Sequence, residues 1–63
     1  MPFDVVVIRF GDQERRMSAD EFMALPLHRR IRHILAREVE FYSGSLPVDR
    51  SIALKSLRAD AAA

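Results

Sequence analysis

What the sequence lacks removes several classes of function. It has no cysteine, which excludes disulfide bonds, zinc sites built on thiolates and thiol nucleophiles. It has only two glycines, too few for the glycine-rich loops that cradle phosphate groups. Ten Lys and Arg against nine Asp and Glu leave a formal net charge of +1, which is too little to bind a polyanion by bulk charge alone. We expect no cofactor and no metal.

Long apolar runs are missing as well. The longest one is Val5 to Ile8, far short of the roughly 20 residues that cross a bilayer. We therefore expect no membrane segment and a cytoplasmic location. Sixty-three residues are enough for one domain, and 49% hydrophobic against 30% charged residues favour a folded chain. We expect a single domain over residues 1–59 and a frayed tail over 60–63.

The N-terminal third of the chain predicts a β-hairpin. Residues 3–10 are rich in β-branched and aromatic side chains, which favour a strand. Gly11 and Asp12 suit a two-residue turn with glycine first, and residues 13–17 can return antiparallel. The first strand is apolar on both faces, which are expected to carry Val6, Ile8 and Phe10 on one side and Phe3, Val5 and Val7 on the other.

A short helix is predicted next. Ser18 can cap it by accepting from the backbone N–H of Glu21, whose carboxylate can reach back to the Ser18 N–H. Pro26 disfavours helical geometry at the residue before it and interrupts the hydrogen-bond ladder. We expect this helix to end near Ala24.

Two further helices complete the prediction. A long amphipathic helix is expected over residues 26–43, ended by Gly44, and a last helix is expected from a cap at Asp49 to about Ala59. The apolar stripe of the long helix would hold Leu27, Ile31, Ile34, Leu35, Val39, Phe41 and Tyr42. Those of the last helix would be Ala53, Leu54 and Leu57. The predicted fold is a small α+β domain in the order ββααα.

The first strand argues for self-association. A lone two-stranded hairpin is marginal in water, and one main helix can cover only one of its faces. Burial against a second copy, by strand pairing or by stacking of hairpin faces, would cover the other face. The alternative is that the short helix and the last helix fold over the second face within one chain.

Glu38 is predicted to lie in the apolar stripe of the long helix, where an unpaired carboxylate is costly. It could be a buried acid with a raised pKa, or it could pair with an arginine such as Arg9 or Arg15, or lie at an interface. We favour the structural role, because buried ion pairs are commoner than catalytic acids and no second catalytic group stands beside it. The predicted interface consists of Phe3, Val5, Val7 and Glu38.

A basic side of the long helix is a second candidate surface. Its members are Arg29, Arg32, His33 and Arg37. They could meet an acidic protein surface or phosphates, or they could form a solvated face. The function we favour is a non-enzymatic adaptor that binds itself or a protein partner. The alternative is a small dimeric DNA-binding regulator that uses the hairpin or this basic side.

No pattern predicts an enzyme. His28 and His33 point about 140° apart on a helix, so they are no metal-binding pair, and the serines lie at caps and turns. Met1 and Pro2 ahead of a strand resemble the start of the small tautomerases of the oxalocrotonate type, whose N-terminal proline acts as a base. That resemblance implies a β-α-β chain with parallel strands, whereas the turn at residues 11–12 predicts an antiparallel hairpin.

Overall fold

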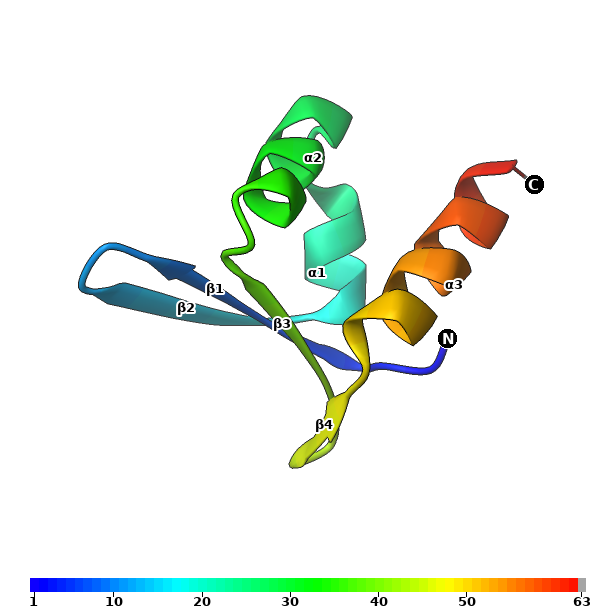
Figure 1. The fold of residues 1–63 in the computed structure, drawn as a ribbon, viewed down its shortest axis with the longest axis horizontal. Helices are drawn as coiled ribbons and strands as arrows, with labels where there is room; N and C mark the ends of the chain where they lie inside the picture. The colour runs from blue at the N-terminus through cyan, green and yellow to red at the C-terminus, as the bar shows by residue number, and fades with distance from the viewer. Residues whose placement is uncertain (63) are drawn as a thin grey trace.

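The computed structural model describes the backbone of residues 1–62 and the side chains of residues 1–59, and Ala63 lies outside the described residues. The elements in chain order are β1 (Val5–Phe10), β2 (Gln13–Ser18), α1 (Ala19–Ala24), α2 (Leu27–Leu35), β3 (Val39–Ser43), β4 (Leu46–Val48) and α3 (Arg50–Ala62). The four strands form one antiparallel sheet in the order β2-β1-β3-β4, and the three helices lie on one side of it (Figure 1). The α+β class is confirmed, with two more strands than the predicted order contains.

The N-terminal hairpin is confirmed. β1 and β2 pair in antiparallel register from Val5 opposite Ser18 to Phe10 opposite Gln13. Gly11 opens the turn with φ +61, a left-handed conformation that glycine adopts without a steric penalty. The hairpin reaches away from the helices at its turn end (Figure 1).

The short helix also begins and ends as predicted. The Ser18 hydroxyl accepts a hydrogen bond from the Glu21 N–H at 3.1 Å, and α1 ends at Ala24. The Glu21 carboxylate accepts from the Ser18 hydroxyl at 3.3 Å, whereas the sequence predicted that it would accept from the Ser18 N–H. Leu25 is extended, with ψ 149, because the ring of Pro26 excludes the helical conformation there.

The prediction of one long helix over residues 26–43 is wrong for the second half of that range. α2 ends at Leu35, and Arg37 takes a left-handed φ of +57. The Arg37 N–H donates to the Ile34 carbonyl and the Glu38 N–H donates to the His33 carbonyl, both at 3.1 Å. These two bonds form a Schellman motif, which ends a helix, although an arginine occupies the position that glycine usually takes.

β3 replaces the missing half of the helix because its side chains follow a period of two. Val39 and Phe41 are buried, while Glu40 and Tyr42 point to the other face. Gly44, predicted to end the helix, instead has φ +62 in the turn between β3 and β4. A β-branched and aromatic run bounded by a glycine is typical of a strand, and here it covers the free edge of β1. The element order is therefore ββααββα.

The core lies between the sheet and the helices. The Phe3 and Phe41 rings are 4.8 Å apart, and Phe22 meets Phe41 edge to face at 6.3 Å. The buried cluster consists of Phe3, Val6, Ile8, Met17, Ala19, Phe22, Val39, Phe41 and Ala53. Burial of the Phe22 and Val6 side chains is complete. These contacts anchor α1 and α3 on the sheet.

The last helix begins as predicted and extends further. The Asp49 carboxylate accepts from the Ser51 N–H at 2.8 Å and from the Ser51 hydroxyl at 2.6 Å. α3 runs to Ala62, so residues 60–62 of the expected frayed tail continue the helix, and Ala63 lies outside the described residues. Ala53 is buried as the pattern predicted, whereas Leu54 and Leu57 are partly buried against the core.

Candidate functional site

The sheet face without helices is less apolar than the sequence suggested. Phe3 belongs to the core, because the chain bends at Asp4 before β1 begins and so leaves the alternation expected for Phe3, Val5 and Val7. Val5 is half-buried, and Val7 is only 3% exposed although no helix covers it. The expected patch of exposed apolar side chains on β1 is therefore not seen.

Long charged neighbours account for the burial of Val7. Its cross-strand partners on the same face are Arg16 of β2 and Glu40 of β3, whose aliphatic stems can lie along the valine. Both edges of β1 are hydrogen-bonded, to β2 and to β3, so this strand has no edge for a twin strand. Contact between two copies through β1 would have to use the face of the sheet.

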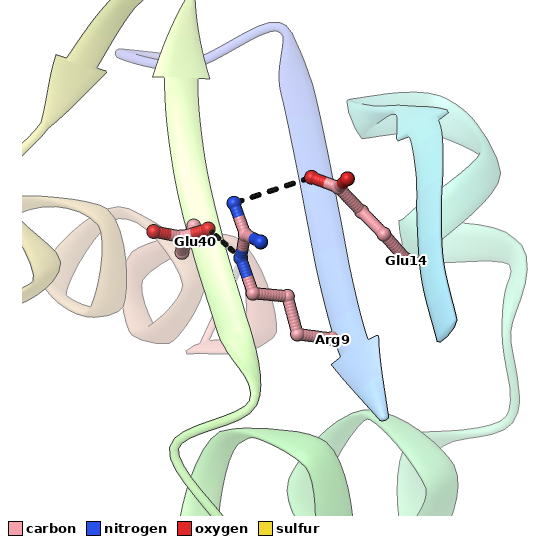
Figure 2. A network of polar contacts seen from close by, with 3 residues as sticks. All are labelled: Arg9, Glu14 and Glu40. Atoms are coloured by element: carbon pink, nitrogen blue, oxygen red, sulfur yellow. Dashed lines mark hydrogen bonds and ion pairs between the residues drawn. The ribbon is translucent and has the colours of Figure 1, made fainter. Parts of the chain in front are cut away.

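An ion-pair network crosses this face (Figure 2). Arg9 lies between Glu14 at 3.2 Å and Glu40 at 2.5 Å, and these carboxylates come from the two strands that flank β1. The hydrogen bond to Glu40, followed by the charge of Glu14, raises the pKa of Arg9 above its ordinary value. All three side chains remain about half exposed, so water weakens their attraction. The network orients the side chains of Arg9, Glu14 and Glu40 on the surface of the sheet and does not enclose a cavity.

Three of the four predicted basic residues line a cleft. Arg29, Arg32 and His33 of α2 face the helix-side surface of the β1–β2 hairpin across a hollow of about 300 Å³. We call it the cationic cleft and define it by Phe10, Gln13, Arg15, Arg29, Arg32 and His33. Arg37, the fourth predicted residue, lies outside it because the chain turns there toward β3.

Glu38 is not on a helix. It lies in the turn between α2 and β3, where its carboxylate is 3.3 Å from Nδ1 of His33 and both side chains are about one-fifth exposed. The sequence predicted an arginine such as Arg9 or Arg15 as the partner of Glu38, and the structure instead places the His33 ring beside the carboxylate. The backbones of His33 and Glu38 are joined by one of the two hydrogen bonds of the Schellman motif. The contact between their side chains therefore stabilises the C-terminal end of α2.

A row of exposed apolar side chains runs along α2. Leu27, Ile31 and Leu35 recur every fourth residue and are 59%, 45% and 76% exposed. They line a hollow of about 450 Å³ between α2 and α3, whose opposite wall carries Leu54 and Leu57. We call this hollow the apolar groove. Figure 1 shows that α2 and α3 lie apart from each other on the helix side of the sheet. The exposed fractions of the three side chains show that no described residue covers this row.

Arginines are the only charged side chains that line the apolar groove in the part of the chain the structure describes, and they are Arg30, Arg50 and Arg58. Arg30 donates to the Leu25 carbonyl at 3.1 Å. Arg50 donates to the Ile34 carbonyl at 2.6 Å and so ties the start of α3 to the end of α2. Arg58 is exposed on α3. The groove is therefore apolar at its floor and positive at its rim.

Clusters of metal-binding side chains are not found among residues 1–59, the part of the chain whose side chains the structure describes. No group of three or more His, Cys, Asp or Glu side chains in these residues could hold a metal ion. Nor does any helix described for this chain have the length and apolar character to cross a membrane.

Two features of these candidate surfaces were not predicted from the sequence. Arg15 and Phe10 line the cationic cleft because the folded chain places the helix-side face of the hairpin across a hollow from α2, and residue spacing carries no sign of that arrangement. The apolar groove escaped because Leu27, Ile31 and Leu35 were assigned to the core. The period-two pattern of residues 39–42 could have shown that strands fill that place.

Comparisons with models of protein families, with curated proteins and with solved structures find no match to this chain.

Proposed function

We propose that this protein is a non-enzymatic interaction module that binds an amphipathic helix with acidic flanks in the apolar groove. One observation carries the proposal: Leu27, Ile31 and Leu35 form an exposed row along α2 that faces a hollow instead of the core. Helix-in-groove recognition uses such a row, with partner side chains spaced by three and four residues.

Burial of this row gives a binding energy of the right size. Full burial of a large aliphatic side chain contributes about 1.5–3 kcal/mol, and these three are roughly half exposed, so each offers about 1–2 kcal/mol. The groove also presents Leu54 and Leu57 from α3. A partner helix that covers both walls can offset part of the cost of association.

The charge of the rim selects the occupant. Arg30, Arg50 and Arg58 line the groove, and among residues 1–59, whose side chains the structure describes, no carboxylate lines it. A symmetric contact between two grooves would bring arginines toward arginines, which disfavours a second copy as the occupant. Glutamates beside the apolar positions of a partner helix would complement the rim.

The other functions expected from the sequence receive less support. Self-association through β1 has only the sheet face to use, where Val7 is buried and the charges of Arg9, Glu14 and Glu40 are partnered. A dimeric DNA-binding regulator requires the same self-association. The exposed α2 row makes docking of a protein helix the better-supported proposal.

Fluorescence anisotropy with a designed peptide tests the proposal. The probe is an amphipathic helix of about 16 residues with Leu at every third or fourth position and Glu on both flanks. A second peptide carries Lys in place of Glu. We expect the Glu peptide to bind at least about tenfold more tightly than the Lys peptide at low salt, and the preference to shrink as salt screens the arginines.

Leu35→Ser and Leu46→Ser form a matched pair of variants. Both leucines are strongly exposed, at 76% and 70%, but only Leu35 lines the groove. We expect Leu35→Ser to weaken the Glu peptide about tenfold and Leu46→Ser to leave it unchanged. Equal effects of the two variants, equal binding of the two peptides, or no binding of either peptide would each contradict the proposal.

A further inference from the structure

We propose that the cationic cleft binds single-stranded nucleic acid, with phosphates held by Arg15, Arg29 and Arg32 and a base stacked on Phe10. This site lies on the opposite side of α2 from the row that faces the apolar groove, and it uses different residues. The proposal therefore does not depend on the docking function.

Two elements distant in sequence converge to build the cleft. On β1 and β2, Phe10 pairs with Gln13 and Ile8 pairs with Arg15, so Phe10 and Arg15 share the helix-side face near the hairpin turn. On α2, Arg29 and Arg32 are three residues apart and line the same hollow. The hollow of about 300 Å³ thus has an aromatic ring and three guanidinium groups on its walls.

The arginines of the cleft lack protein partners. Among the described residues, Arg15, Arg29 and Arg32 donate no side-chain hydrogen bond and form no ion pair. In contrast, Arg9 bonds to Glu40 and Arg50 bonds to a backbone carbonyl. Among residues 1–59, no carboxylate lines the cleft, and the nearby Glu38 carboxylate lies 3.3 Å from Nδ1 of His33. Three unpaired guanidinium groups in one hollow favour an anionic ligand with several charged oxygens.

Phe10 distinguishes nucleic acid from other anions. Its side chain is 62% exposed at the cleft, where a ring stacked on a base would lose its contact with water. Stacking needs an unpaired base, because the bases of a duplex already stack on each other. Arginines that hold a backbone beside an aromatic platform are the usual design of proteins that bind single strands.

Anisotropy of a labelled single-stranded oligonucleotide of mixed sequence, about 10 nucleotides long, tests this proposal in DNA and RNA versions. With about three phosphates neutralised, the logarithm of the binding constant should fall against the logarithm of salt concentration with a slope of about −2. We expect the matching duplex to bind at least about tenfold more weakly. Oligoglutamate at equal charge concentration should displace little of the bound strand.

Neighbouring arginines on β2 provide the control. Arg15 faces the cleft, whereas Arg16 pairs with Val7 on the opposite face of the sheet. We expect Arg15→Gln to weaken binding several-fold and to reduce the salt slope by about 0.7, and Arg16→Gln to change binding less than twofold. Phe10→Leu should weaken binding about tenfold without reducing the slope.

Several results would overturn the proposal: no binding, equal effects of Arg15→Gln and Arg16→Gln, unchanged affinity in Phe10→Leu, equal affinity for the duplex, or full displacement by oligoglutamate. Thermal melting by circular dichroism verifies that each variant is folded. Leu35→Ser, which alters the apolar groove, should bind the oligonucleotide as the parent protein does.

Discussion

Arg37→Gly should stabilise the protein, because Arg37 holds the left-handed conformation that ends α2. A non-glycine residue in this conformation costs about 1–2 kcal/mol, whereas glycine adopts it freely. Glycine also gains about 0.5–1 kcal/mol of freedom in the unfolded chain. The net gain is about 0.5–1 kcal/mol, which raises the Tm of a domain of this size by about 4 °C. Arg37 has no side-chain hydrogen bond or ion pair within the described residues, so no contact is lost.

The sign of this effect separates the observed fold from the helix that the sequence predicted over residues 26–43. In a continuous helix, glycine at this position would lower stability by about 1 kcal/mol relative to alanine. Arg37→Ala is the control, since alanine is strained in the left-handed conformation as arginine is. Thermal melting should rank glycine above alanine and arginine. A ranking with glycine lowest would refute the Schellman motif and the strand that follows it.

Three further predictions concern the other helix ends. Ser18→Ala removes the acceptor for the Glu21 N–H and should cost about 1 kcal/mol in the free energy of unfolding, whereas Ser18→Asp should retain most of the stability; equal losses would contradict the cap. The pKa of Asp49 is lowered, first by the Ser51 hydroxyl and then by the Ser51 N–H. The ionised Asp49 carboxylate therefore stabilises the fold above its unfolded pKa of about 3.9, and this stabilisation is lost as pH falls through the lower folded pKa. When Tm is measured as a function of pH, Asp49→Asn should lose less Tm below about pH 4 than the parent protein does. Arg50→Leu removes the hydrogen bond to the Ile34 carbonyl, so it should lower the free energy of unfolding by about 1 kcal/mol and weaken binding of the Glu peptide. An unchanged Tm and unchanged peptide binding would show that Arg50 does not hold α2 and α3 in the arrangement that forms the groove.

The first half of the fold could be predicted from signals that are local in the sequence. Gly11, the Ser18 cap and Pro26 each act on the few residues beside them, so the hairpin and α1 follow from the sequence alone. The Asp49 cap gave the start of α3 in the same way.

In the second half of the chain, residues after Leu35 could continue the helix or form a strand, and local signals do not decide between the two. Ala36 and Arg37 carry no glycine or proline to mark the end of α2, and the apolar residues after them fit a helical stripe as well as a strand. The strand prevails because β1 has an open edge and because Val39 and Phe41 reach the core only with a period of two. Tertiary pairing therefore overrides the helical pattern.

The candidate surfaces also divide into one that local sequence signals predict and one that depends on the tertiary fold. The basic residues Arg29, Arg32 and His33 could be identified from α2 alone, because they share one side of a single helix. The apolar groove could not, because it exists only once β3 has taken the place in the core that the long helix would have filled.

Methyl NMR spectra recorded during titration with the Glu-flanked peptide test the central claim most directly, namely that the free α2 row is the docking surface. The proposal predicts that the methyl signals of Leu27, Ile31 and Leu54 move while that of Leu46 stays fixed, and that dilution of the free protein moves none of them. Shifts centred on Val5 and Val7, shifts of the α2 row on dilution, or no shifts at all would contradict the account.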